Sequence, residues 1–413
     1  FYLDRAAASE LTREKTPWLV REVEWDHPMT KRAVIWLSKK LDKAILRLEA
    51  ADFFRHQMHS LAHAYDSIDD LCREVFEDLR QRITYRDQLF SNETVIVFSP
   101  HPDDDVISMG GMLDKVVRNG NDVTVAYMTN GSVAVFDADV RRFLRFATLS
   151  PEALGIDDAG SSFGEKRGEI LQFIDQKDPG TVDTEDVQQL KAHVRYGEAI
   201  AAIEVMGLGE ESARFLDMPF YKTGRVRKDA IGPDDVDVVL DLLNEVQPDH
   251  VFVAGDLSDP HGTHRMCYKA ISEALGRYNA ERTSREAAGA TVPDQDEEAA
   301  DVDAPVAGDG APHPPTHVVQ PKVWLYRGAW QEWEVDRADV FVPMSKADLD
   351  RKVEAIFKHE SQKDRAMFPG AYDEREFWQR ARDRNRGTAD TLNNLGLPEF
   401  HAAEAFVTTY EMP

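Results

Sequence analysis

The chain has 413 residues, of which 42% are hydrophobic, and a formal net charge of −26. This length suits one large domain with appendages or two domains, and no apolar run is long enough to span a bilayer. So acidic a chain is not expected to bind nucleic acid or an anionic membrane, because those surfaces attract basic proteins.

The chain begins at Phe1 and shows no charged and apolar leader, so we expect no signal peptide and a processed piece or fragment of a longer protein. Its two cysteines, Cys72 and Cys267, are far apart and are not needed to staple a chain of this size. They favour a reducing cytoplasm in which both thiols are buried or inert.

Residues 1–90 are polar and helical in pattern. Segments 31–41 and 68–79 repeat apolar residues near helical spacing, and no His, Cys or carboxylate cluster there has ligand spacing. We predict a helical arm or linker that packs on a following domain, residues 91–413.

From residue 93 onward, predicted strands alternate with predicted helices. The strands cover 95–99, 122–128 and 250–254, and the helices cover 107–118, 195–206, 234–246 and 265–275. Folded order is expected to resume at 322–326. Strands separated by helices of this length imply right-handed crossovers and a parallel sheet that is covered on both faces. The sequence therefore predicts an α/β fold with a Rossmann-like, mostly parallel sheet and helices on both faces, preceded by the helical arm.

The interval 280–321 departs from this pattern. It is rich in Ala, Asp, Glu and Pro and has few large apolar residues. A segment with so little to bury cannot offset the entropy of ordering it, so we predict a mobile acidic insertion at about 280–321.

A charged cluster follows the first predicted strand: His101-Pro102-Asp103-Asp104-Asp105. Open α/β sheets bind their ligands at the C-terminal tips of such strands. One imidazole and one carboxylate from this loop could hold zinc and leave a neighbouring carboxylate free as a base. The alternative is a turn with solvated aspartates, because Pro and Asp favour turns.

A second histidine cluster follows the predicted strand 250–254. His261 and His264 lie three residues apart at the start of a predicted helix, so both can face one side of it. One of them could complete a His-Asp-His metal set, while the other contacts the substrate.

These motifs resemble those of the zinc-dependent de-N-acetylases of the LmbE/PIG-L family, which act on N-acetylglucosaminyl groups. The resemblance covers roughly residues 93–370 and rests on His101-Pro102-Asp103-Asp104, Gly110-Gly111, His261-Gly262-Thr263-His264, Thr129-Asn130-Gly131, Arg195-Tyr196-Gly197-Glu198-Ala199, Lys352-Val353-Glu354-Ala355-Ile356 and His359-Glu360-Ser361-Gln362. Asp105 stands where the family usually carries Glu, so the resemblance implies no role for it.

The resemblance implies that His101, Asp104 and His264 bind Zn²⁺, with Fe²⁺ as the alternative metal. It implies a general base at Asp103, and an oxyanion stabiliser or acid at His261. The chain would then be a metal-dependent amidohydrolase acting on linear amides. It would remove the N-acetyl group from an N-acetylglucosamine-type sugar or sugar phosphate through a zinc-bound water.

Further residues are candidates for contacts with the substrate. Arg195, Thr129 and Gly131 are predicted to bind it, and an ion pair with Glu198 is the alternative for Arg195. The aromatic residues either stack on a sugar or belong to the core: Trp324, Tyr326, Trp330 and Trp333.

Residues 1–20 resemble the junction of bacterial fusions in which a glucosamine-6-phosphate deaminase domain precedes a deacetylase-like domain. A deaminase-associated module and a non-catalytic sugar-binding domain are therefore alternatives. The expected partners are a small-molecule amino sugar and a fused or associated deaminase domain, and a homo-oligomer stays open. No nucleotide cofactor is expected, since Gly110-Gly111 lacks the spaced glycines of a dinucleotide loop.

Overall fold

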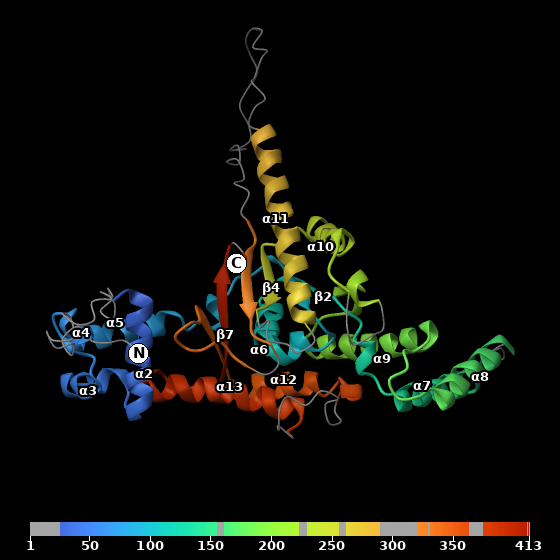
Figure 1. Ribbon diagram of the computed structural model, residues 1–413, viewed down its shortest axis with the longest axis horizontal. Helices are drawn as coiled ribbons and strands as arrows, with labels where there is room; N and C mark the ends of the chain where they lie inside the picture. The colour runs from blue at the N-terminus through green and yellow to red at the C-terminus, as the bar shows by residue number, and fades with distance from the viewer. Residues whose placement is uncertain are drawn as a thin grey trace, which may run out of the picture.

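The computed structural model describes residues 25–154, 161–222, 229–255, 262–289, 320–328, 331–362, 375–410 and 412. In this part of the chain a seven-stranded sheet has the order β3-β2-β1-β4-β5-β7-β6 (Figure 1). Its strands are β1 (Thr94–Ser99), β2 (Asp122–Tyr127), β3 (Ala213–Phe215), β4 (His250–Ala254), β5 (Lys322–Tyr326), β6 (Val340–Met344) and β7 (Ala402–Thr409). Strands β1 to β5 pair in parallel, whereas β7 is antiparallel to β5 and β6. The predicted mostly parallel α/β sheet is confirmed.

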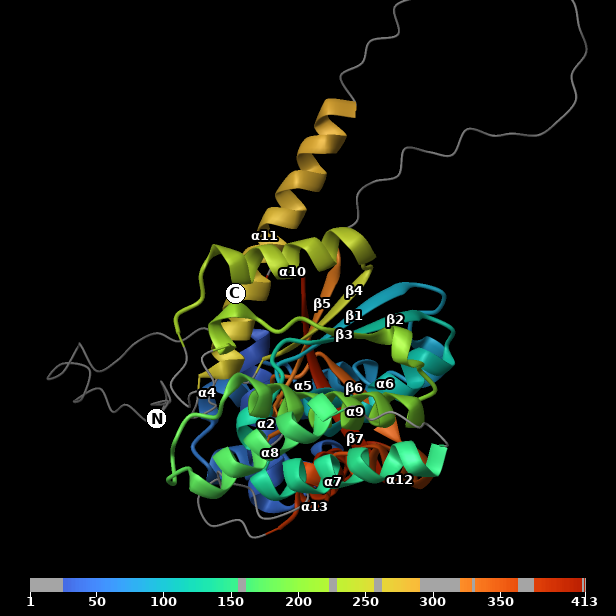
Figure 2. The same cartoon turned by 90° about the vertical axis from the view of Figure 1, so that its right-hand side faces the viewer.

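Both faces of the sheet are buried, as the unbroken apolar run of β1 requires. Val95 and Val97 join the core on one face, and Ile96 and Phe98 join the core on the other. Two helices cover one face, α10 (Pro233–Val246) and α11 (Thr263–Gly289) (Figure 2). Four helices lie on the opposite side: α6 (Asp104–Arg118), α9 (Glu185–Val205), α12 (Lys346–Ile356) and α13 (Phe377–Asn394).

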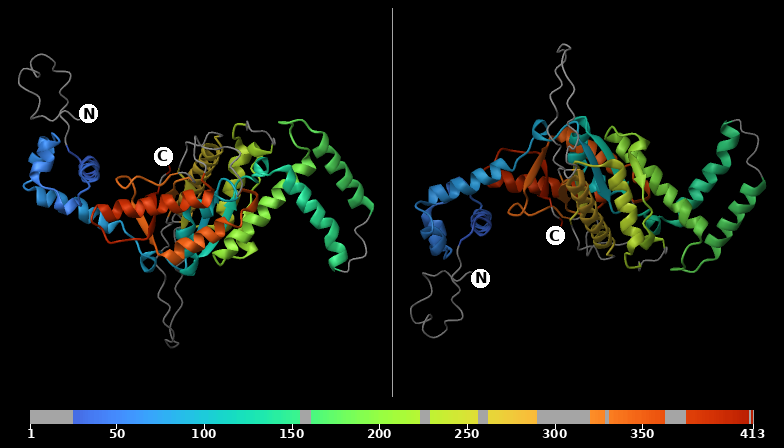
Figure 3. Two further views of the ribbon diagram at one scale, coloured as in Figure 1. Left: turned by 90° about the horizontal axis from the view of Figure 1, so that it is seen from below. Right: turned by 90° about the horizontal axis from the view of Figure 1, so that it is seen from above.

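The first described helices form a separate bundle at one end of the molecule (Figure 3). They are α2 (His27–Leu41), α3 (Ala50–Arg55), α4 (His59–His63) and α5 (Ile68–Gln81). Helix α5 begins where the side chain of Ser67 accepts a hydrogen bond from the Asp70 amide, a standard N-cap. Leu37 and Phe53 of the bundle share a core with Phe341 of β6 and Leu392 of α13. The N-terminal helices are therefore packed on the C-terminal elements of the sheet domain.

Two neighbouring phenylalanines test this packing. Phe53 is fully buried in the shared core, whereas the side chain of Phe54 is 39% exposed. Phe53→Ala should lower the free energy of unfolding by about 3–5 kcal/mol, because it leaves a cavity in the core. The matched control Phe54→Ala should cost about 1 kcal/mol or less in the same urea titration. Equal losses from the two variants would contradict this arrangement of the bundle.

The structure differs from the sequence prediction at several elements. Helix α11 continues to Gly289, so the predicted start of the insertion at about 280 is wrong, and residues 280–289 are helical. Good helix formers such as Ala, Glu and Arg dominate that stretch. The rest of the predicted insertion up to residue 319 lies outside the described residues.

Other elements were not predicted at all. Strand β7 has three alanines, a residue type that is depleted in strands, and β6 contains Pro343. Helices α7 (Asp137–Leu154) and α8 (Ser161–Gln176) extend from the end of the molecule opposite the N-terminal bundle (Figure 3). No helix in the described ranges combines the length and the apolar character needed to cross a membrane.

Both cysteines are free and buried, as the sequence suggested. Burial raises the pKa of the Cys72 thiol to about 12, and the nearby carboxylates of Asp69 and Asp52 add to the shift. The thiol is therefore protonated and unreactive near neutral pH.

Candidate active site

The strand order reverses direction between β1 and β4. From β1 the chain moves outward through β2 to β3, and from β4 it moves the other way to β5. In open α/β sheets the crevice beyond the carboxyl ends of two such strands is the usual ligand site. The loop after β1 carries His101 to Asp103, and α11, which follows β4, carries His264 in its first turn.

Three predicted metal ligands meet beyond the carboxyl ends of these strands. His101, Asp104 and His264 each offer a ligand atom, and these atoms all lie within 4.8 Å of one another. Asp104 Oδ2 lies 3.0 Å from His101 Nδ1 and 3.2 Å from His264 Nε2. Two imidazoles and one carboxylate are a common catalytic zinc set that leaves a coordination position open. The donor set therefore fits the metal that the sequence implies.

Asp104 is almost completely buried, at 4% exposure. Burial alone would raise the pKa of this carboxyl group. The charge of His264 and hydrogen bonds with His101 and His264 outweigh burial and hold the pKa far below its ordinary value. Asp104 is thus an anion at neutral pH, as a metal ligand must be.

Asp103 stands next to this set but is held by a different partner. Its Oδ2 lies 3.0 Å from Nη2 of Arg195 on α9, and the arginine is only 1% exposed. Glu198, one helical turn further along α9, lies 3.9 Å from the same guanidinium. The predicted alternative, an ion pair of Arg195 with Glu198, is thus the longer of two contacts. The shorter contact, with Asp103, was not predicted.

Glu198 links α9 to the C-terminal part of the chain. Its two carboxylate oxygens accept hydrogen bonds from the amide and the hydroxyl of Ser361, at 2.6 Å and 2.7 Å. Burial raises the pKa of Glu198, and the charge of Arg195 and the bonds from Ser361 oppose that rise. The Arg-x-x-Glu and His-x-Ser-Gln elements therefore meet in space, which their separation in the sequence did not reveal.

Asp105, for which the sequence suggested no role, ties the loop to the two central strands. It is fully buried, its amide donates to Ser99 Oγ at 3.1 Å, and its Oδ2 accepts a hydrogen bond from the Tyr127 hydroxyl at 3.1 Å. Burial raises the pKa of Asp105 to about 7, although the hydrogen bonds from Val106 and Tyr127 oppose this. Its contacts are structural rather than directed at the metal set.

His359 adds an imidazole to the edge of the site. It is 2% exposed, and together with Asp103 and Ile107 it lines a small, mainly apolar cavity that also includes Phe377 and Trp378. Neither of its ring nitrogens has a hydrogen-bond partner among the described residues. Burial lowers its pKa to about 3, so the ring is neutral near pH 7.

The predicted substrate-binding residues at the tip of β2 lie beside the same loop. The Thr129 hydroxyl donates to the Pro100 carbonyl at 2.7 Å. Gly131 has a φ of +62°, and a Cβ there would meet Arg195 Nε and Pro102 Cδ, each at 3.1 Å. Only glycine allows this backbone conformation and this close approach together.

His261 lies outside the described residues, as does Trp330. Of the other aromatic candidates for a sugar-stacking wall, Trp324 and Tyr326 are buried in the core at 4% and 1% exposure. The Tyr326 hydroxyl donates to the Phe98 carbonyl at 2.7 Å, and Trp333 Nε1 donates to the Leu325 carbonyl at 2.8 Å. Trp324 and Tyr326 are therefore core residues and not a stacking surface.

Two curated proteins resemble this chain. A glucosamine-6-phosphate deaminase-like protein of Bacteroides thetaiotaomicron is 37% identical over 419 residues, which cover 98% of this chain and 58% of that protein. Diacetylchitobiose deacetylase of Thermococcus kodakarensis is 30% identical over 126 residues, which cover 26% of this chain and 47% of that enzyme. The chain thus spans less than two thirds of the length of either relative.

Solved structures show more distant likenesses. 4-Carboxy-2-hydroxymuconate hydratase from Pseudomonas putida has a TM-score of 0.43 at 18% identity, over 78% of this chain and 98% of that one. N,N'-diacetylchitobiose deacetylase from Pyrococcus horikoshii has a TM-score of 0.42 at 18% identity, over 83% and 91%.

The family model described as PIG-L, GlcNAc-PI de-N-acetylase, matches residues 96–275. This range contains the loop after β1, the tip of β2, the Arg195 helix and the start of α11. The chain therefore carries a PIG-L family domain over residues 96–275.

Proposed function

We propose that the chain is a metal-dependent hydrolase that removes the N-acetyl group from an N-acetylglucosamine-type sugar or sugar phosphate. The observation that carries the proposal is that two neighbouring carboxylates have different partners. Asp104 lies between two imidazoles, and Asp103 beside it is paired with Arg195 instead. The family match and the similarity to a diacetylchitobiose deacetylase support the same reaction class.

In this proposal His101, Asp104 and His264 hold the metal, with Zn²⁺ favoured over Fe²⁺. When bound, such a metal acidifies water and polarises a carbonyl group. Asp103 acts as the general base that takes a proton from the attacking water. The water oxygen bonds to the amide carbon, the C–N bond breaks, and Asp103 returns the proton to the departing amine. The products are acetate and the free amino sugar.

The remaining roles also stay proposals. We assign His261, three residues before His264, to stabilising the oxyanion or donating a proton. Arg195 orients Asp103 through their ion pair, and any contact of Arg195, Thr129 or Gly131 with the substrate is a further expectation. The free, buried cysteines are consistent with the reducing cytoplasm that we propose as the location.

The alternative function follows from the name of the longer Bacteroides relative. The chain could serve a deaminase as an associated module, or bind a sugar without turnover. Because the chain covers 58% of that relative, the name applies to a longer protein than this chain.

A product assay separates these functions. The purified chain would be incubated with a panel of N-acetylglucosamine compounds, with and without a 6-phosphate, and with glucosamine 6-phosphate. We expect acetate from at least one acetylated compound and no ammonia from glucosamine 6-phosphate. Ammonia without acetate would overturn the proposal in favour of deamination, and neither product would favour a binding module.

A further inference from the structure

Helix α6, which begins with the ligand Asp104, is broken inside. Met109 has φ −135° and ψ 23°, so the helix consists of a first turn and a second segment that continues to Arg118. In a regular α-helix the amides of Gly111 and Met112 would donate to the carbonyls of Ile107 and Ser108. All these backbone groups lie in a buried part of the helix, where polar groups need partners.

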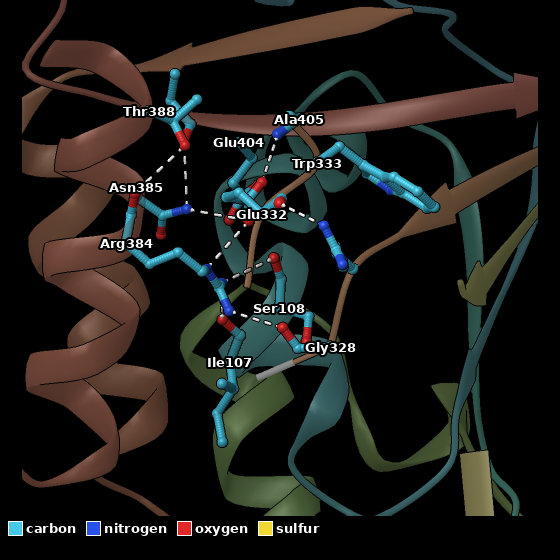
Figure 4. A network of polar contacts seen from close by, with 12 residues as sticks. Ile107, Ser108, Gly328, Glu332, Trp333, Arg384, Asn385, Thr388, Glu404 and Ala405 are labelled. Carbon is cyan, nitrogen blue, oxygen red and sulfur yellow. Dashed lines mark hydrogen bonds and ion pairs between the residues drawn. The ribbon is translucent and has the colours of Figure 1, made fainter. Parts of the chain in front are cut away.

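Two charged side chains from distant elements bind these four groups. Glu404 of β7 accepts hydrogen bonds from the amides of Gly111 and Met112, at 3.0 Å and 2.7 Å. Arg384 of α13 donates through Nη2 to the carbonyls of Ile107 and Ser108, at 2.7 Å and 3.3 Å (Figure 4). The anion thus binds the amides that start the second segment, and the cation binds the carbonyls that end the first.

Buried partners hold both charges in place. Lys352 of α12 lies 2.6 Å from Glu404, and both side chains are fully buried. Lys352 also donates to Asn385 Oδ1 at 2.8 Å. Glu332 lies 3.1 Å from Arg384 Nε and accepts a hydrogen bond from the Ala405 amide at 2.8 Å. Figure 4 shows the link from Arg384 through Glu332 to the strand that carries Glu404.

The two glycines after the break make room for this arrangement. A Cβ on Gly110 would lie 3.0 Å from Cγ of Lys352, and one on Gly111 would overlap Sδ of Met344 and lie 3.2 Å from Glu404 Oε1. Any side chain at Gly111 would therefore displace Met344 and crowd the carboxylate that binds the helix.

We propose that Glu404, Lys352 and Arg384 form a buried charged cluster, called the splint below, that fixes the first turn of α6. In this proposal Glu404 is a positioning residue for Asp103 and Asp104. A buried ion pair contributes little net stability, since its desolvation cost offsets its attraction. Its value here is geometric, because a carboxylate has two oxygens that can accept from two adjacent amides. The catalytic part of this inference rests on the proposed function, whereas the mechanical part does not.

The test compares Glu404→Gln with Lys31→Met. Lys31, like Lys352, is a buried lysine that pairs with a carboxylate: it is 4% exposed and lies 3.4 Å from Asp78. It lies in the N-terminal bundle, far from α6 in the fold (Figure 1). Both variants should lose stability. In hydrogen exchange on the metal-free proteins, only Glu404→Gln should accelerate the amides of residues 104–112, by about tenfold or more, because local opening controls exchange.

A second readout uses Co²⁺ as the probe metal. Glu404→Gln should bind Co²⁺ about 10–100-fold more weakly and with an altered visible spectrum, as for loss of a group that orients metal ligands. Lys31→Met should keep the wild-type affinity and spectrum. The double variant Glu404→Gln/Lys352→Met, which removes both charges, should regain stability without regaining the wild-type Co²⁺ affinity or spectrum.

The proposed splint is ruled out if the amides of residues 104–112 exchange hydrogen at the wild-type rate in Glu404→Gln. The positioning role is overturned if the double variant recovers stability and Co²⁺ affinity together. Absence of Co²⁺ binding by the wild-type protein would contradict the proposed function instead, and the exchange experiment would still decide the splint.

Discussion

Asp103→Asn is expected to abolish acetate release while the protein keeps its metal. The amide cannot take the proton of the attacking water, and general acid–base catalysis by one group is typically worth about 10²–10⁴-fold in rate. Metal content should stay at the wild-type level, because the three ligand atoms that cluster within 4.8 Å belong to His101, Asp104 and His264. The measurement is kcat for acetate release together with the metal-to-protein ratio.

The neighbouring carboxylate provides a matched control. Asp105 contacts Ser99 and Tyr127, and asparagine can keep at least one of these hydrogen bonds. Asp105→Asn should therefore lose much less activity than Asp103→Asn. Full activity in Asp103→Asn would rule out its role as the base, and metal loss in that variant would mean that Asp103 belongs to the ligand set.

The pairing of Asp103 with Arg195 sharpens this expectation. The Arg195 guanidinium lies 3.0 Å from one carboxylate oxygen and forms an ion pair with it. It also orients one carboxylate oxygen and leaves the other for the proton in transit. This contact joins residues 92 positions apart in the chain, so no local pattern could have predicted it.

Local sequence patterns predicted the centre of the fold well. The apolar run at β1 and the helices that alternate with strands indicated a mostly parallel sheet, and its order places two histidine-bearing segments beyond the carboxyl ends of neighbouring strands. Both histidines follow the tips of predicted strands, which explains why the sequence alone allowed His101 and His264 to be paired. The spacing of the motifs could not show which aspartate faces the imidazoles, and for this the resemblance to a family was needed.

Features that depend on tertiary contacts were missed. The antiparallel strand β7 has an alanine-rich sequence with little strand preference, and it forms because β5 and β6 offer it pairing edges. The hydrogen bonds from Ser361 to Glu198 join residues that are 163 positions apart in the sequence. Trp324 and Tyr326 are aromatic, as residues that stack on sugars usually are, and only their packing shows that they belong to the core.

The structure gives one explanation for both the Gly110-Gly111 pair and Lys352, the first residue of the motif at 352–356. Gly110 lies against Lys352, and Lys352 holds the carboxylate that binds the amide of Gly111. The sequence marked these residues only through resemblance. Their proximity indicates that part of the motif serves the shape of α6 rather than contact with a substrate.

Removal of the metal tests the central claim most directly. The protein would be stripped with a chelator, dialysed, and assayed for acetate release from the best N-acetylglucosamine compound of the panel, before and after addition of Zn²⁺. A Zn²⁺ ion both acidifies water and polarises the carbonyl group, so its loss should reduce the rate by several orders of magnitude. The account predicts near-complete loss of acetate release after stripping and recovery with about one Zn²⁺ per chain, as one three-ligand site requires. Unchanged acetate release from protein shown to be metal-free would contradict it.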